Sequence, residues 1–154
     1  MTRDESEKRD RQMIELLNEL RVALPGVQIL FGFLLTVPFA QGFQHVTPTQ
    51  KTLFYASLLA TAVSTVCLIA PSATHRLRFH KSDRAYLIET ANKYLIAGLA
   101  FLAVAIVLAL VMITDVLYQG SAMFAFPAAI ALLLLGLWFV RPLVRTARGR
   151  SSGP

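Results

Sequence analysis

The chain has 154 residues, of which 55% are hydrophobic and only 16% are charged, whereas about a quarter of the residues of a soluble globular domain carry charge. Its net charge of +6 does not indicate a nucleic-acid-binding protein, because the basic residues stand beside long apolar stretches, where orientation in a membrane explains them. The one cysteine, Cys67, cannot form an intramolecular disulfide, and the sequence has no spacing typical of a metal site or a cofactor.

Residues 1–21 are expected to form a charged cytosolic segment that ends in an amphipathic helix. Four apolar residues in its second half recur at the helical spacing i, i+3, i+4 and i+7: Met13, Leu16, Leu17 and Leu20. This helix either fixes the start of the first span or binds a partner. Because the segment lacks a short basic n-region, the apolar stretch after it is predicted to be an uncleaved transmembrane helix rather than a signal peptide.

Four apolar segments form a predicted transmembrane domain, residues 22–140, with spans at about 22–41, 52–70, 94–113 and 123–140. The first has no charged residue between Val22 and Ala40, which matches the roughly 20 residues that cross a bilayer as a helix. Pro25 is placed in the first turn of this span, where proline is tolerated. Pro38 is predicted to kink or end the first span, and Pro71 is predicted to end the second.

The distribution of Lys and Arg predicts the orientation of the chain. Of the 15 basic residues, 14 stand in segment 1–21, in the loop 72–93 or in the tail 141–154, and Lys51 alone stands in a loop on the other side. Both termini and the central loop are therefore expected in the cytoplasm, with the protein in the plasma membrane. The predicted fold is an all-α membrane protein, an up-down-up-down bundle of four transmembrane helices that is preceded by the cytosolic amphipathic helix.

Helices associate in lipid through small and polar residues, and each of the first three spans carries a stripe of them. The stripes are Gln28, Gly32, Leu35 and Thr36 in the first span, Ser57, Thr61, Ser64, Thr65 and Leu68 in the second, and Gly98, Ala105, Ala109 and Met112 in the third. We expect the three stripes to meet at the centre of the bundle. They either pack the helices together or line a polar path for a solute or a proton.

Gln28 is the most polar residue within a predicted span, and its amide is costly in hydrocarbon without a partner. Ser64 or Thr65 is the expected partner, and contact with a ligand or an ion is the alternative. No ionisable residue stands near the middle of a span, where proton-coupled antiporters use a carboxylate. The nearest is Asp115, at the outer end of the third span, which is either an interfacial or turn residue or the carboxylate of an outer vestibule.

Charged and titratable residues are predicted to gather at the cytosolic ends of the spans: Glu15, Glu19, Arg21, His75, Arg76, Arg84 and Lys93. A helix is expected to begin near Ser82 and to continue into the third span, with Glu89 and Lys93 as a favourable i, i+4 pair. The cluster either fixes topology and binds anionic headgroups or forms a docking surface. The three scattered His residues do not predict a metal site, and without a P-loop or a nucleophile elbow the chain is not expected to be an enzyme.

Two stretches carry a more specific pattern. In the first, Glu19-Leu20-Arg21-Val22 precedes Gly26, Gln28, Leu30-Phe31 and Phe33-Leu34-Leu35-Thr36; in the second, Ala70-Pro71 precedes His75-Arg76. This pattern resembles an uncharacterised family of small four-span membrane proteins from actinobacteria, a domain of unknown function. Some members of that family are labelled sodium:proton antiporter, so the resemblance implies a four-span layout and antiport as a candidate activity.

Two functional hypotheses follow. The preferred one is a non-enzymatic membrane protein that acts through helix contacts, either with a second copy of itself or with another membrane protein. The alternative is a small cation-coupled or proton-coupled transporter or channel that uses Gln28, the Ser/Thr stripe of the second span and Asp115.

Overall fold

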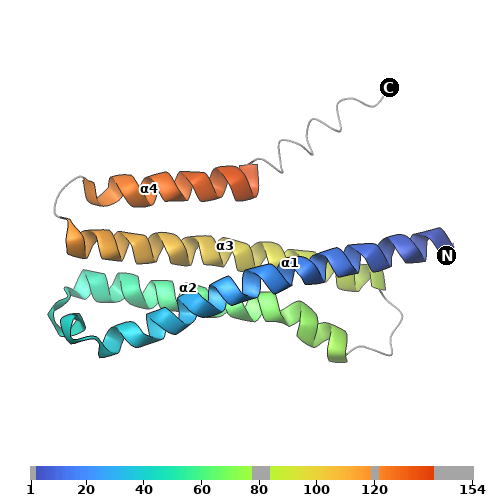
Figure 1. The fold of residues 1–154 in the computed structure, drawn as a ribbon, viewed down its shortest axis with the longest axis horizontal. Helices are drawn as coiled ribbons and strands as arrows, with labels where there is room; N and C mark the ends of the chain where they lie inside the picture. Colours follow the sequence, from blue (N-terminus) through green and yellow to red (C-terminus); the bar gives the residue numbers. More distant parts are fainter. Residues whose placement is uncertain (1–2, 78–83, 119–121, 141–154) are drawn as a thin grey trace, which may run out of the picture.

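The computed structural model describes residues 3–77, 84–118 and 122–140, and every regular element in these ranges is a helix (Figure 1). The long helices are α1 (Arg3–Thr36), α2 (Pro48–Leu77) and α3 (Arg84–Leu117). The shorter α4 (Ala122–Leu134) continues as a π-helical segment, η3 (Leu135–Val140). Two 3-10 helices, η1 (Val37–Phe39) and η2 (Gln41–His45), connect α1 to α2.

Helices α2 and α3 lie side by side and antiparallel, and they form the largest interface of the molecule. Figure 1 shows α1 running across this pair, while α4 follows the opposite side of α3. Consecutive helices alternate in direction. The structure thus confirms the predicted all-α bundle of four helices.

Three of the helices are long and apolar enough to span a membrane. Their apolar stretches are Ile14–Phe39, Pro48–Ala73 and Glu89–Leu117, with 26, 26 and 29 residues, against the roughly 20 that a bilayer requires. The apolar stretch of α4, Phe124–Trp138, is shorter. Many large apolar side chains face outward, as hydrocarbon surroundings permit; Phe33, Val66 and Leu132 are about 70% exposed, at 69%, 69% and 71%.

The amphipathic segment and the first span form one continuous helix across the predicted boundary between residues 21 and 22. Leu16 and Leu20 are buried in the same core cluster as Val27, which shows that the apolar stripe continues in register along α1 and needs no break. Pro25 therefore lies inside a helix rather than in its first turn. It has no N–H for the carbonyl of Arg21, four residues earlier. The α-helix ends at Thr36, before Pro38, as predicted.

Helix α2 is longer at both ends than the predicted span. It begins at Pro48 because Thr47 caps it: the Thr47 N–H donates to Gln50 Oε1 (2.8 Å), and the Gln50 N–H donates to Thr47 Oγ1 (3.3 Å). This reciprocal pair is a capping box with proline at the first helical position. The predicted end at Pro71 is wrong, since α2 continues to Leu77 with Pro71 buried inside it. Membrane helices tolerate an internal proline where neighbouring groups satisfy the freed backbone.

Helix α3 runs unbroken from Arg84 through the third span, as predicted, although the expected start near Ser82 lies outside the described residues. Two core clusters join the first three helices. One contains Leu20, Val27 and Leu68, and the other is formed by Leu34, Phe54 and Met112. In the second cluster, Phe54 also meets Phe43 edge to face, with ring centroids 5.1 Å apart. The core thus orients one face of α1 toward α2 and α3 and leaves its other faces free.

Candidate functional site

The small and polar stripes of α2 and α3 meet along a seam. Ser57 Oγ donates a hydrogen bond to the carbonyl oxygen of Ala105 (2.8 Å), and Ser64 Oγ donates to that of Gly98 (2.7 Å). The two serines are seven residues apart on α2, and their acceptors are seven apart on α3. This equal spacing keeps two antiparallel helices in register over two turns. Both serine side chains are fully buried.

Gly98 lets the two helices approach closely. A Cβ at position 98 would lie 2.7 Å from both Cγ and Cδ2 of Leu68 and 3.4 Å from Cβ of the half-buried Cys67. Leu68 itself is fully buried in the core. The position therefore requires glycine for packing, as in other close membrane helix pairs.

The two threonines of the α2 stripe bond within their own helix. Thr61 Oγ1 donates to the Ser57 carbonyl (2.8 Å), and Thr65 Oγ1 donates to the Thr61 carbonyl (2.9 Å). Across the described residues no buried side-chain polar atom lacks a hydrogen-bond partner. The hydroxyls of the seam are thus engaged with carbonyls.

Asp115 takes part in a polar contact at the end of the seam near the α1–α2 connection. It lies in the last turn of α3, and its Oδ2 accepts a hydrogen bond from Nε2 of Gln50 (2.8 Å). Gln50 is buried, and its Oε1 accepts the Thr47 N–H. One glutamine side chain therefore joins the cap of α2 to the end of α3. Gln50 was not among the predicted site residues, although Thr-Pro-Thr-Gln carries the pattern of a capping box.

The stripe of α1 does not join the other two, contrary to expectation. Gln28, Gly32 and Thr36 all lie on an exposed face, because α1 packs through Leu20, Val27 and Leu34 instead. Thr36 Oγ1 donates to the carbonyl of Phe33 (2.7 Å). Ser64 and Thr65 bond to carbonyls, so the partner expected for Gln28 is not there. Within the part of the chain that the structure describes, the Gln28 amide makes no hydrogen bond.

The predicted charge cluster can be placed only in part. Glu89 and Lys93 form the expected i, i+4 ion pair, with 2.9 Å between Oε1 and Nζ, on an exposed surface where such pairs contribute little. Glu15, Glu19 and Arg21 are exposed on α1. For His75, Arg76 and Arg84 the structure describes the helical backbone but not the side chains. Residues 3–77, 84–118 and 122–140 contain no group of three His, Cys, Asp or Glu residues that could hold a metal ion.

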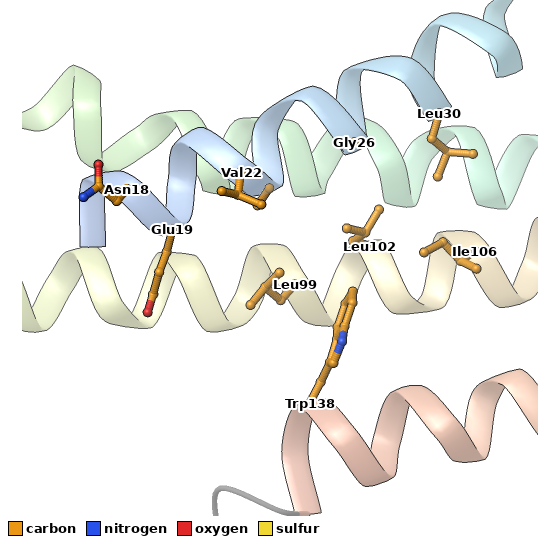
Figure 2. Close-up of a pocket in the computed structure, with 10 residues that line it drawn as sticks. Asn18, Glu19, Val22, Gly26, Leu30, Leu99, Leu102, Ile106 and Trp138 are labelled. Carbon is orange, nitrogen blue, oxygen red and sulfur yellow. The ribbon is translucent and has the colours of Figure 1, made fainter. Parts of the chain in front are cut away.

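A groove of about 810 Å³ runs between α1 and α3 on the side toward α4. Its walls come from Asn18, Glu19, Val22, Ala23, Gly26 and Leu30 of α1, from Leu99, Leu102 and Ile106 of α3, and from Trp138 of η3. Figure 2 shows Asn18 and Glu19 at one end of the groove, Leu30 and Ile106 at the other, and Trp138 reaching toward Leu102. Sequence analysis did not predict this groove.

Comparison with family models gives one match, a family of unknown function (DUF6328), which covers residues 2–142. The chain belongs to this family. The match confirms the membership that the pattern from Glu19 to Thr36 predicted. Comparison with curated proteins finds no match, and comparison with solved structures finds none either.

Two surfaces of this DUF6328 protein are candidate binding surfaces for another molecule. The first is the α1 face that carries Gln28 and Gly32, where an amide can donate and accept hydrogen bonds at once. The second is the groove, which combines a long apolar wall with a carboxylate at one end. The α2–α3 seam differs from both, because its polar groups already have partners.

Proposed function

We propose that this DUF6328 protein is a non-enzymatic membrane protein that acts through helix contacts made by the exposed face of α1, with a second copy or with another membrane protein. The observation that carries the proposal is Gln28. Its side chain lies well inside the apolar stretch Ile14–Phe39, faces outward and has no hydrogen bond within the described residues. An unpaired amide in hydrocarbon is costly, and a neighbouring helix can satisfy it.

The residues around Gln28 fit such a neighbour. Arg21, Pro25, Gly32 and Thr36 recur with it every three to four residues, so they share one face of α1. A Cβ at Gly32 would meet nothing within 4 Å, so a partner helix has room to approach the backbone there. The small side chains at Gly32 and Thr36 allow a close helix contact, and the Gln28 amide supplies its hydrogen bond.

The proposal includes the placement of the chain as a multi-pass protein of the plasma membrane with both termini in the cytoplasm. It is supported by the concentration of 14 of the 15 basic residues in residues 1–21, 72–93 and 141–154. In this arrangement α4 is a fourth span. Its short apolar stretch is accommodated by local thinning of the bilayer or by oligomerisation.

Cysteine crosslinking tests the α1 contact with a second copy. In a Cys67→Ser background, Gly32→Cys is expected to give an oxidised dimer in vesicles, since position 32 lies on the contact face. Phe33→Cys is the matched control, because it is one residue away and 69% exposed but faces another side of α1. Adding Gln28→Leu is expected to reduce crosslinking at position 32.

Equal crosslinking at positions 32 and 33 would show random collision and would contradict a specific face. No dimer from Gly32→Cys would exclude the second copy. The remaining partner, another membrane protein, would then be tested by placing a photocrosslinker at position 28 in cells. Loss of the resulting adduct in a Gly32→Leu variant is expected, and an adduct that Gly32→Leu leaves unchanged would contradict the contact.

A further inference from the structure

The groove between α1 and α3 lies on a different side of α1 from the proposed contact face. Its volume of about 810 Å³ is within the range of about 300–1,000 Å³ that is typical of ligand sites. Apart from Asn18 and Glu19 at one end, its lining is apolar or aromatic, with Val22, Leu102 and Trp138 among the walls. A ligand that fits must therefore be a long apolar molecule with a polar group at one end.

The depth of the groove indicates where such a molecule comes from. The apolar stretch Ile14–Phe39 has 26 residues, or about 39 Å of helix, against about 30 Å of hydrocarbon. If its far end marks one edge of the hydrocarbon, the other edge falls near Leu20. Glu19 then lies at the level of lipid headgroups, and the rest of the groove lies at the level of acyl chains.

Charge distinguishes one headgroup from another. Glu19 is exposed and makes no ion pair within the described residues, and Glu15 precedes it by one turn on the same side of α1. These carboxylates repel an anionic headgroup and attract an ammonium group. The Asn18 amide can donate a hydrogen bond to a phosphate oxygen. The residues that line this end of the groove therefore include one carboxylate and no cation, although the net charge of the whole chain is +6 and the exposed Arg11 and Arg21 stand nearby on α1.

We infer that the groove binds an acyl chain of an aminophospholipid of the phosphatidylethanolamine class, whose ammonium group pairs with Glu19. The site prefers this zwitterionic lipid to anionic phosphatidylglycerol. The net charge of +6 by itself would favour the anionic lipid. The inference does not depend on the helix contact proposed for Gln28, which uses another face of α1.

Trp138 makes the inference measurable because it is the only tryptophan of the chain, lines the groove and is 36% exposed. The full-length protein would be placed in phosphatidylcholine vesicles that contain phosphatidylethanolamine or phosphatidylglycerol with brominated acyl chains. Bromine quenches tryptophan fluorescence on contact. Brominated phosphatidylethanolamine is expected to reach half-maximal quenching at a roughly two- to fivefold lower mole fraction than brominated phosphatidylglycerol. One exposed ion pair contributes a difference in affinity of this size.

Two glycines supply a matched pair of variants. Gly26→Leu fills the groove, and Gly42→Leu adds the same side chain in η2, away from both the groove and the proposed contact face; a Cβ meets nothing within 4 Å at either position, so both variants are expected to fold. Gly26→Leu should reduce quenching by brominated phosphatidylethanolamine at least twofold, whereas Gly42→Leu should leave it unchanged. Glu19→Gln should keep the quenching but remove the difference between the two headgroups.

Equal or stronger quenching by phosphatidylglycerol in the unmodified protein would overturn the inference. Equal quenching in the two leucine variants would do so as well. A Trp138 that is shielded from every brominated lipid would show that protein, such as a second copy of the chain, covers the groove, and this too would contradict a lipid site.

Discussion

Gly98 decides how closely α2 and α3 pack. A Cβ there would lie 2.7 Å from two carbons of Leu68, which is fully buried and has little room to move. We expect Gly98→Ala to lower the free energy of unfolding by about 1–3 kcal/mol, the usual cost of overpacking. Thermal or denaturant unfolding of the purified protein in detergent micelles would measure it.

A double-mutant cycle separates this clash from other effects of the alanine. In a Leu68→Ala background, Gly98→Ala should cost less than it does alone, because the atoms that it would contact are gone. Gly32→Ala is the control, since its Cβ meets nothing within 4 Å and alanine favours a helix over glycine. Equal destabilisation by Gly98→Ala and Gly32→Ala would contradict the packing role of Gly98.

Helix contacts could be predicted from the sequence where both contacting helices carry small residues at helical spacing. Ser57, Ser64 and Gly98 were expected at a helix interface, and the structure brings them together. Gln28 was expected there too, but its spacing shows only which residues share its face. The spacing does not show whether that face packs against α2 and α3 or faces outward. Leu20 and Val27 pack into the core instead, so the Gln28 face of α1 points outward.

At the scale of an element, the start of α2 depends on its capping box. Thr47→Ala removes the side-chain acceptor for the Gln50 N–H and should destabilise the first turn by about 0.5–2 kcal/mol. Gln50→Ala should cost more, because it also breaks the bond to Asp115. Hydrogen exchange of amides 49–52 would measure both effects. Thr49→Ala, an exposed change in the same turn, should be nearly neutral, and a similar effect from all three variants would argue against the cap.

The positions at which helices begin and end were harder to predict from the sequence than the existence of the helices. The start of α2 was missed because the second span was placed by its apolar residues, from about residue 52, and the capping threonine and glutamine precede them. The predicted end at Pro71 was wrong because proline ends helices less strictly in a tightly packed membrane bundle. For α1, the polarity change near Arg21 indicated a boundary, yet the buried stripe from Leu16 to Val27 is continuous. Packing, rather than composition, determines where these helices stop.

At the scale of the whole molecule, the polar groups of the seam between α2 and α3 are engaged in packing contacts. Its buried hydroxyls donate to carbonyls, and Asp115 accepts a bond from Gln50. In proteoliposomes with sodium, potassium or proton gradients, we expect no flux above that of protein-free vesicles. Flux in the unmodified protein that Asp115→Asn abolishes, with folding retained, would contradict this expectation and support the transporter hypothesis.

The groove could not be predicted from sequence because it depends on relative helix lengths and positions. Its lining residues are ordinary apolar residues of α1 and α3, and its third wall exists because η3 brings Trp138 alongside them. The bundle itself was predictable, since three apolar stretches of 26 to 29 residues have few alternatives to spanning a membrane.

The continuity of α1 has a mechanical consequence. Its 34 residues form a rod of about 51 Å, so about 20 Å extends beyond a hydrocarbon layer of about 30 Å. A helix transmits rotation about its axis along its length. Rotation of the charged N-terminal end about the helix axis would therefore rotate the Gln28 face by the same angle. Bending is expected at Pro25, where one backbone hydrogen bond is missing. At this length α1 can reach from the hydrocarbon of a membrane into the water phase.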